Sequence, residues 1–218
     1  NMPGEDITGY GVVELDDDQR MINFEEKPFE PQHETVSLGV YVMSRELLIN
    51  LLEEIQNEGR YSIVNDIIIR YRRKLKIYAY MFEGYWRSVR TIKEYYDMSM
   101  EFLEEDIQKL FFKTSPYFYT KVKDEPPTKF NVGSTVCCSL LGGGVINNGA
   151  VLNTILFRKV YVGDQSKVHH SIIMENTTIG RNCVIEYAIL DKNVVISDNQ
   201  KVIGTKDKLV VLPKNTII

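Results

Sequence analysis

The sequence predicts a mixed α/β region followed by an all-β parallel β-helix. Up to about residue 112, segments with the two-residue period of strands alternate with segments that have the 3.6-residue period of helices. Residues 113–134 contain several prolines and show no regular period, which is typical of a linker. From there on, apolar residues recur every 17 positions. We therefore expect three regions, 1–112, a linker over 113–134, and a repeat domain over 135–218.

Four segments of the first region have the composition of strands. Residues 11–15 and 21–25 predict two strands joined by an acidic turn. Residues 37–42 are almost continuously apolar, so we expect a third strand that is buried on both faces. Residues 76–81 predict a fourth strand. The first region therefore has the strands of a mixed sheet.

Helix signals lie between and after these strands. Ser44 is placed to cap a helix with a leucine-rich face, and Ser62 to cap a shorter one. Thr91 and Glu94 have the spacing of a capping box, in which each side chain accepts a hydrogen bond from the backbone near the other residue. Helical spacing of apolar residues continues from there, and we expect one helix from Thr91 to about Phe112.

The second half of the chain carries an internal repeat of 17 residues, within which apolar positions follow at intervals of six, six and five. Six is not a multiple of the helical period, so the repeat is not helical. Three short strands per coil instead form a triangular prism, with coils stacked at about 4.8 Å. This is a parallel β-helix of the hexapeptide type. The expected apolar columns are Val151, Val168, Ile185 and Val202; Val145, Val162, Ile179 and Ile196; and Leu156, Ile173 and Leu190.

Charge and cysteine content exclude several classes of protein. The net charge is −4, which gives no overall field that would favour nucleic acid or an anionic membrane as partner. No apolar run approaches the roughly 20 residues that a membrane-spanning helix needs. Cys137, Cys138 and Cys183 lack the spacing of a zinc site or a disulfide framework, and we expect them to be reduced in a cytoplasmic protein. Cys137 and Cys138 are expected to be small packing residues.

Two local features invite functional readings. Tyr85 and Trp86 open the stretch GYWRSVRT, and both packing and substrate contact stay open for them. His169 and His170 invite comparison with the catalytic histidine of hexapeptide acyltransferases. Neighbouring residues on a strand point to opposite faces, so at most one of the two faces inward. We favour a surface position at a corner of the coil.

Several motifs, taken in order, carry a family resemblance. The stretches YGVVELDDD, FEEKP, SLGVYVM, GYWRSVRTIKEYY, TKVKDEPPTKF and HSIIMENTTIG resemble bacterial glucose-1-phosphate adenylyltransferases, also called ADP-glucose pyrophosphorylases. The resemblance implies a Rossmann-like nucleotidyltransferase domain and a left-handed β-helix. It also implies the reaction of ATP with glucose 1-phosphate to ADP-glucose and pyrophosphate, in glycogen biosynthesis. The glycine-rich ATP loop of the family does not precede the first strand, so we expect a C-terminal fragment.

The resemblance carries sugar-phosphate-binding roles onto four residues, Gly11, Glu26, Lys27 and Ser37. Each residue type suits the task. A lysine offers a compact ammonium with three donors for a phosphate, and a glutamate accepts hydrogen bonds from sugar hydroxyls. A glycine permits close backbone approach, and a serine adds a hydroxyl. Glucose 1-phosphate or ADP-glucose is the implied ligand.

One site of the family is altered in this chain. Active members carry Tyr-Trp-Arg-Asp-Val-Gly-Thr where this chain has GYWRSVRT, and their aspartate helps to hold Mg²⁺. Ser88 stands at the aspartate position and Arg90 at the glycine position. Serine lacks the charge that a hard cation prefers, so we expect no intact catalytic site and no Mg²⁺ bound to this chain. The pattern resembles the regulatory, weakly active or inactive subunit that pairs with a catalytic subunit in a heterotetramer.

Three alternatives remain open from the sequence. One is another sugar-1-phosphate nucleotidyltransferase that transfers a guanylyl or uridylyl group, and only the family-like motifs argue against it. A hexapeptide acyltransferase would leave the FEEKP half unexplained. A structural assembly subunit would differ only in failing to bind a sugar phosphate, which a titration with glucose 1-phosphate tests. Base specificity and the identity of any effector are not predicted.

Overall fold

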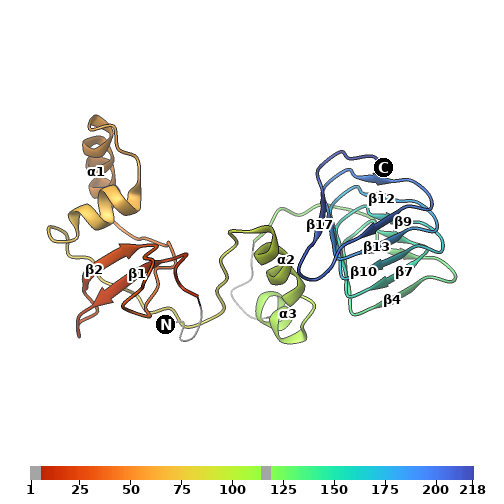
Figure 1. The fold of residues 1–218 in the computed structure, drawn as a ribbon, viewed down its shortest axis with the longest axis horizontal. Coiled ribbons are helices and arrows are strands. Elements are labelled where there is room, and N and C mark those ends of the chain that lie inside the picture. The colour runs from red at the N-terminus through yellow and green to blue at the C-terminus, as the bar shows by residue number, and fades with distance from the viewer. Residues whose placement is uncertain (1–5, 114–118) are drawn as a thin grey trace. The chain divides into compact units, whose positions relative to one another are not determined.

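The computed structural model describes residues 6–113 and 119–218 (Figure 1). The chain divides into two compact units, Asn1–Tyr85 and Trp86–Ile218. This division lies well before residue 112, where we placed the end of the first domain, and that boundary stays a prediction. The start of the chain and part of the expected linker fall on residues 1–5 and 114–118, which lie outside the described residues. In the described ranges, no helix is long and apolar enough to cross a membrane.

The first unit is built on an antiparallel hairpin, as predicted. Strand β1 (Gly11–Leu15) pairs with β2 (Met21–Glu26), and Gly11 lies opposite Glu26. Single bridges extend the hairpin on both sides, from Val12 to Val36 and from Arg20 to Tyr78. The order in space is therefore residues 35–37, β1, β2 and residues 77–79.

The strand predicted over residues 37–42 is wrong. Gly39 has φ +73°, and no ladder continues beyond Val36. Tyr41 and Met43 pack against the core, whereas Val40 and Val42 are 78% and 97% exposed. Apolar character on both sides of this segment indicated burial of both faces, but only one face is covered in the described part of the unit.

The strand predicted over residues 76–81 is also wrong, although the segment is extended at its centre. The amide of Met21 donates to the carbonyl of Ile77 at 2.8 Å, and the amide of Ala79 donates to Gln19 at 2.9 Å. These bonds reach only the turn of the hairpin, too few to form a strand of the sheet. Tyr78 and Tyr80 face away from the core and are exposed.

Two helical segments cover the hairpin and form the core of the first unit. Helix α1 (Arg45–Asn57) begins at Ser44, whose hydroxyl accepts from the amide of Leu47. The shorter segment η1 (Ile63–Ile69) begins at Ser62 in the same way, and it is π-helical. Both predicted caps are therefore confirmed. The core joins the two segments to the hairpin through Val13, Met21, Phe24, Leu51, Ile55, Ile67, Ile68 and Tyr71.

The second unit opens with two helices rather than the single helix predicted over residues 91–112. Helix α2 (Ile92–Glu101) and helix α3 (Glu105–Phe112) are separated by a turn. The chain folds back so that the Phe102 ring lies 5.0 Å from the Phe111 ring, and Gln108 donates to the Phe102 carbonyl. A continuous helix would hold Phe102 and Phe111 far apart along its axis. Aromatic packing therefore explains the break.

The predicted capping box at the start of α2 is confirmed and is reinforced by an ion pair. The amide of Glu94 donates to the Thr91 hydroxyl at 3.1 Å, and the Thr91 amide donates back to the Glu94 carboxylate at 3.2 Å. Arg90 donates to the same carboxylate from its guanidinium at 2.9 Å and from its amide at 2.6 Å. These bonds, the guanidinium contact first, hold the pKa of Glu94 below its usual value.

The rest of the second unit is the predicted parallel β-solenoid, built from three five-stranded sheets (Figure 1). The sheets run β16-β13-β10-β7-β4, β17-β14-β11-β8-β5 and β15-β12-β9-β6-β3. The strands are β3 (Lys129–Phe130), β4 (Thr135–Cys137), β5 (Leu140–Leu141), β6 (Ile146–Asn147), β7 (Ala150–Leu152), β8 (Ile155–Leu156), β9 (Tyr161–Val162), β10 (Lys167–His169), β11 (Ile172–Ile173), β12 (Thr178–Ile179), β13 (Val184–Glu186), β14 (Ala188–Leu190), β15 (Val195–Ile196), β16 (Lys201–Ile203) and β17 (Val210–Leu212).

The apolar columns are confirmed with one exception. Val151, Val168, Ile185 and Val202 are paired in register, as are the members of the other columns except Val145. Asn147, not Val145, pairs with Val162, because only two residues connect β6 to β7 where four connect β9 to β10. The fixed 17-residue period therefore misplaces Val145, which is nevertheless fully buried.

Backbone geometry and small polar residues hold the corners of the solenoid. Gln165, Asn182 and Asn199 recur at one corner, each with φ between +55° and +63°, a conformation that asparagine tolerates better than most residues. At another corner the Thr154 hydroxyl donates a hydrogen bond to the carbonyl of Val168 and accepts one from the amide of Ser171. This buried hydroxyl satisfies backbone groups that the coil cannot pair.

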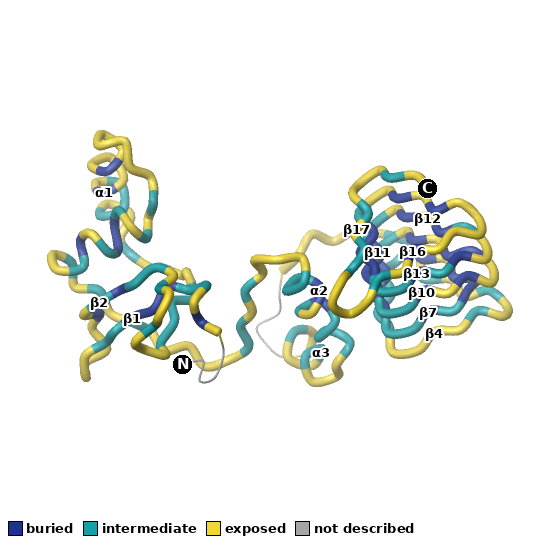
Figure 2. Tube along the Cα trace, viewed as in Figure 1, coloured by how far each residue is buried: buried dark blue, intermediate teal, exposed yellow. Residues whose placement is uncertain are grey.

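Helix α2 covers the outer face of one solenoid sheet. Ile172 and Ile189 point outward from β11 and β14, yet they are buried and form a cluster with Tyr96. Buried residues in α2 and along the solenoid strands are dark blue in Figure 2. The Tyr96 hydroxyl donates to the backbone carbonyl of His170 at 2.7 Å. Burial raises the pKa of Tyr96 to about 12. The helix is thus fixed to the solenoid by both apolar contact and a hydrogen bond.

A pair of isoleucines tests whether the solenoid interior carries the stability. Ile185→Ala is expected to lower the free energy of unfolding by about 2–5 kcal/mol, because Ile185 is fully buried. Ile203→Ala, on the adjacent strand β16, is the control, because Ile203 is 53% exposed. Chemical denaturation measures both. Equal losses in the two variants would contradict the assignment of the interior.

The ion pair at the start of α2 predicts a pH-dependent contribution. Glu94→Gln is expected to lower the free energy of unfolding at pH 7, because the charge that Arg90 pairs with is removed. The pKa of Glu94 is lowered in the folded state, so its contribution is present above the unfolded pKa. This contribution is lost as the pH falls through the pKa that Glu94 has in the folded state, which lies below the ordinary value of 4.5.

Denaturation of wild type and Glu94→Gln across about pH 2.5–7, a range that includes the ordinary carboxylate pKa, measures the difference between their free energies of unfolding. Glu104→Gln is the matched control, because the Glu104 side chain makes no capping hydrogen bond at the start of α3. A difference in free energy of unfolding between wild type and Glu94→Gln that stays constant to the lowest pH would show that the charge of Glu94 is not involved.

Candidate functional site

The four residues predicted to bind a sugar phosphate gather at one end of the hairpin in the first unit. Gly11 on β1 lies opposite Glu26 on β2, and Lys27 follows directly. The amide of Ser37 donates to the Gly11 carbonyl at 2.8 Å, which brings the third segment to the same place. The structure therefore brings together residues that are up to 26 positions apart, and their binding role stays a prediction.

Gly11 is required by its immediate surroundings. A Cβ at this position would lie 2.4 Å from Cζ of Phe24 and 3.1 Å from the Glu26 carboxylate. A ring carbon at 2.4 Å cannot be accommodated without movement of Phe24, which belongs to the core. Any larger residue at position 11 would therefore disturb both the core and the carboxylate of Glu26.

Charged and hydroxyl groups project from this end of the hairpin. The Lys27 side chain is 65% exposed, and its ammonium lies 3.9 Å from the Glu26 carboxylate in a loose ion pair. Lys27 has φ +50°, and its amide donates to the Tyr10 carbonyl. An accessible cation beside a carboxylate can bind a phosphate and a hydroxyl of one ligand.

Tyr41 also reaches this end of the hairpin and was not predicted. Its hydroxyl lies 3.2 Å from the hydroxyl of Ser37, and the Gly39 amide donates to the same serine oxygen at 3.3 Å. Tyr41 follows Ser37 by four residues on a segment that we predicted to be a buried strand. Had the segment been recognised as the exposed edge beside β1, the Tyr41 hydroxyl would have been a candidate for the site.

Residues 84–91, which we call the tryptophan corner, include the point along the chain where the first compact unit ends and the second begins. Tyr85 ends the first unit and Trp86 begins the second, and both are half-buried. Arg87 donates from Nε to both oxygens of Glu101, at 3.0 and 3.1 Å, and Arg90 is bonded to Glu94. The corner is therefore fixed to α2 by two arginine–glutamate pairs.

The oxygen donors of this corner decide whether it could hold Mg²⁺. Ser88 gives the corner a neutral hydroxyl, whereas a hard divalent cation prefers carboxylate oxygens. Glu94 and Glu101, which follow on α2, are each engaged by an arginine. Nowhere in residues 6–113 and 119–218 do three or more histidines, cysteines or acids gather in a group that could hold a metal.

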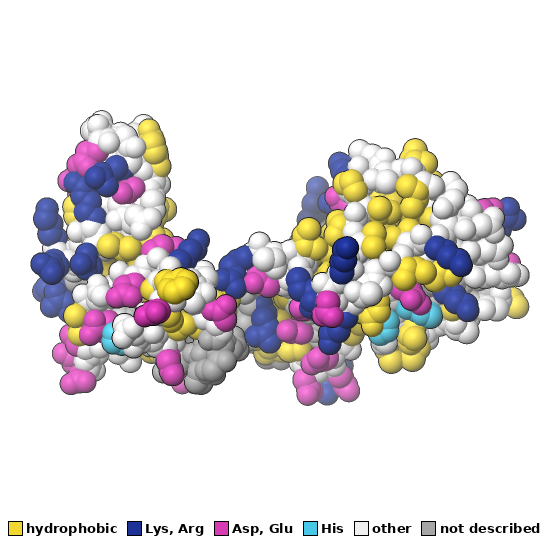
Figure 3. Space-filling model, viewed as in Figure 1, with side chains coloured by type: hydrophobic (Ala, Val, Ile, Leu, Met, Phe, Trp, Pro, Cys, Tyr) yellow, Lys and Arg dark blue, Asp and Glu magenta, His cyan; other side chains and the backbone are white. Residues whose placement is uncertain are grey.

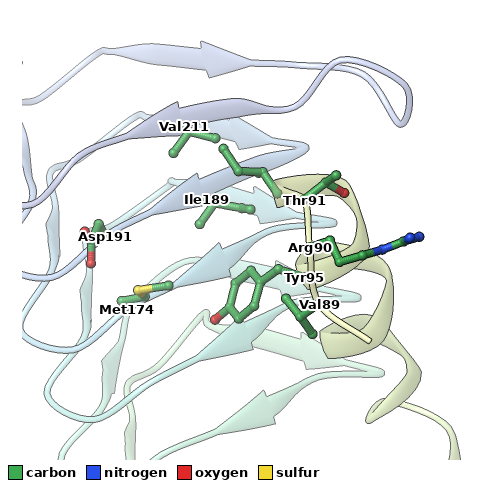
Figure 4. A pocket seen from close by; sticks show the side chains of 9 residues that line it. Val89, Arg90, Thr91, Tyr95, Met174, Ile189, Asp191 and Val211 are labelled. Atoms are coloured by element: carbon green, nitrogen blue, oxygen red, sulfur yellow. The ribbon is translucent and has the colours of Figure 1, made fainter. Parts of the chain in front are cut away.

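A pocket of about 390 Å³ lies between the start of α2 and the outer face of the solenoid (Figure 4). Tyr95, Met174 and Ile189 line it, with Asp191 at one side. The guanidinium of Arg90 points away from the pocket (Figure 4), toward Glu94. The pocket is thus mainly apolar and contains none of the predicted sugar-phosphate residues.

The histidines lie on the surface of the solenoid, as we favoured (Figure 3). Val168 is the residue of β10 that points inward. The ring of His170 stacks on Tyr187, with centroids 4.8 Å apart, and Nδ1 of His169 lies 3.6 Å from the Glu186 carboxylate. Both imidazoles therefore have structural neighbours at a coil corner.

The prediction that Cys137 and Cys138 are packing residues is wrong. Both are exposed, because they lie at the end of β4, the outermost strand of its sheet. Cys183 is fully buried. Its thiol lies 3.1 Å from the carbonyl of Ser197.

Comparison with known families matches both halves of the chain. Residues 1–105 match the family described as nucleotidyl transferase, and residues 126–209 match the one described as GlmU-like, C-terminal hexapeptide. The two matches follow each other in the order in which the hairpin unit and the solenoid occur. They agree with the fold that the sequence predicts.

Several curated proteins similar to this chain are named glucose-1-phosphate adenylyltransferase. The chain is 34% identical over 202 residues to the protein of this name from Desulforamulus reducens, a match that covers 91% of this chain and 50% of that protein. Proteins of the same name from Desulfitobacterium hafniense strain Y51 and Corynebacterium jeikeium are 30% and 28% identical, over 89% and 100% of this chain. Of these two proteins the matches cover 50% and 62%.

The chain thus spans about half the length of the first of these relatives. Across that span it keeps the order of a hairpin-based nucleotidyl transferase region and a hexapeptide solenoid. The chain therefore combines a nucleotidyl transferase domain with a hexapeptide-repeat β-solenoid and is a homologue of the glucose-1-phosphate adenylyltransferases.

Proposed function

We propose that this chain acts as a regulatory subunit of a glucose-1-phosphate adenylyltransferase, binding a sugar phosphate without catalysing adenylyl transfer. The observation that carries the proposal is the tryptophan corner. A serine stands there where the resemblance places a metal-binding aspartate, and two glutamates of α2, Glu101 and Glu94, are held by Arg87 and Arg90. The hairpin end, in contrast, keeps Gly11, Glu26, Lys27 and Ser37 together.

Sugar-phosphate binding uses the groups at the hairpin end. The exposed ammonium of Lys27 binds the phosphate of glucose 1-phosphate, and the carboxylate of Glu26 accepts hydrogen bonds from sugar hydroxyls. Ser37 and Tyr41 provide a pair of hydroxyls on the adjacent segment. Gly11 keeps the space in which Phe24 and Glu26 sit, so that the site is held by the core rather than by a flexible loop.

Catalysis is impaired because the charge balance at the corner is reversed. In the family, Mg²⁺ neutralises phosphate charge during transfer, and its loss removes a main source of rate acceleration. Here Arg90 adds a cation where the resemblance places a glycine. Arg90 is committed to Glu94 and turned away from the pocket, so it does not replace the metal.

A catalytic subunit of the same enzyme is the partner implied by this role. We infer a mixed tetramer in which the present chain responds to glucose 1-phosphate or ADP-glucose and changes the activity of that partner. The support is the resemblance to regulatory subunits together with the altered corner. A purely structural assembly subunit is the alternative, and it would bind no sugar phosphate.

Calorimetric titration with glucose 1-phosphate tests the binding role. Wild type is expected to bind, and Lys27→Met is expected to bind at least tenfold more weakly, or about 1.4 kcal/mol, because the phosphate loses its ammonium partner. Lys109→Met is the control, since Lys109 pairs with Glu105 on α3 in the other unit. No binding by wild type would support the assembly role instead, and equal binding by Lys27→Met would exclude the hairpin end.

Assays of ADP-glucose synthesis test the regulatory role. With ATP, glucose 1-phosphate and Mg²⁺, the chain alone is expected to be at least about 10²-fold slower than the glucose-1-phosphate adenylyltransferase of the same organism, because electrostatic stabilisation of the transferring group is lost. Mixing the two proteins is expected to change the rate of the active one. Robust Mg²⁺-dependent synthesis by the chain alone would refute the proposal.

A further inference from the structure

Two adjacent thiols lie in contact at an exposed corner of the solenoid. Cys137 ends β4, and Cys138 follows it with φ +48°. Their sulfur atoms are 3.2 Å apart, and both residues are exposed. Strand β4 pairs only with β7, so one edge of this strand is unpaired in the described structure.

The contact leaves the two thiols in an arrangement suited to mutual reaction. One thiol donates a hydrogen bond to the other sulfur, and this bond raises the pKa of Cys137. Both thiols are exposed, so an oxidant can reach the pair from solvent. A disulfide needs its sulfurs at about 2.05 Å, so closure requires a movement of only about 1 Å.

The backbone makes such a disulfide reversible. Adjacent Cα atoms lie about 3.8 Å apart across a trans peptide, shorter than the roughly 4.4–6.8 Å that disulfides usually span. The resulting ring is strained, and strained or exposed disulfides are reduced more readily than structural ones. A bond between these residues therefore has the properties of a labile redox pair and not of a structural crosslink.

We propose that Cys137 and Cys138 form a thiol–disulfide redox site that a hydroperoxide oxidises. The Cys138 sulfur attacks the peroxide oxygen and gives up its thiol proton, which yields a sulfenic acid at Cys138 and releases water or, from an alkyl peroxide, an alcohol. The Cys137 sulfur then attacks the Cys138 sulfur and its thiol proton leaves with the sulfenic oxygen as water. The peroxide is reduced by two electrons, which the two thiols supply.

Oxidation has a defined local consequence. The carbonyl of Cys137 accepts the amide of Asn153 at 3.2 Å and the hydroxyl of Ser139 at 2.8 Å. Closing the ring rotates the peptide that carries this carbonyl, so both bonds weaken. The first corner of the solenoid thereby loosens where β4 leads into β5, while the buried columns further along are unaffected. Cys137 and Cys138 belong to the second compact unit, whereas the four predicted sugar-phosphate residues belong to the first.

Mass spectrometry of the whole chain tests the proposal. Treatment of the monomer with hydrogen peroxide is expected to remove about 2 Da, the two thiol hydrogens, and a dithiol reductant is expected to restore the mass. Peptide mapping should place the bond between Cys137 and Cys138. Amide exchange at Asn153 should rise on oxidation.

Variants separate this bond from general thiol oxidation. Cys137→Ser and Cys138→Ser are each expected to abolish the 2 Da loss and to take up oxygen or form dimers at the remaining exposed thiol. Cys183→Ser is the matched control and should keep the loss, because Cys183 is buried. Persistence of the loss in Cys138→Ser, or oxygen uptake without any 2 Da loss in wild type, would overturn the proposal.

Discussion

The second unit depends on one constraint, that each buried residue of a coil lies directly over its counterpart in the next coil. Parallel pairing aligns Val168 with Val151 and Ile185, and shifting a strand by one position would turn these side chains outward. The corners with positive φ keep this alignment by returning the chain at a fixed place. The platform so formed presents Ile172 and Ile189 to α2. The first turn of α2 holds Arg90 through Glu94, and its last residue, Glu101, holds Arg87.

The first unit relies on a different device, a short hairpin held from one side. Phe24 and Met21 anchor the hairpin on α1 and η1, and the glycine at position 11 leaves room for the phenylalanine ring. This anchoring positions the Glu26 carboxylate while Lys27, just past the end of β2, stays accessible. The charged end is therefore rigid on the core side and open on the other, as a ligand site requires.

Much of this organisation is readable in the sequence, and the errors have physical causes. Periodicity found the solenoid because most of its apolar positions recur every 17 residues, and it failed at Val145 where a corner is two residues shorter. Capping residues located the starts of helices, but the break after Glu101 depends on contact between Phe102 and Phe111, which no local pattern encodes. Residues 37–42 have the composition of a buried strand, yet burial depends on what covers them. Likewise the clustering of Gly11 with Ser37 rests on a long-range hydrogen bond, and only the resemblance connected them.

The coils of the solenoid also differ in length without any cost to their alignment. Six residues, 204–209, connect β16 to β17 where Tyr187 alone connects β13 to β14, and yet Leu212 still lies beside Leu190. The extra residues of a longer coil are therefore accommodated entirely in the connecting segment, and the pairing of the strands does not change. Evolution can thus vary the surface of such a protein by lengthening a single bend, and a designer can graft a peptide there without redesigning the interior.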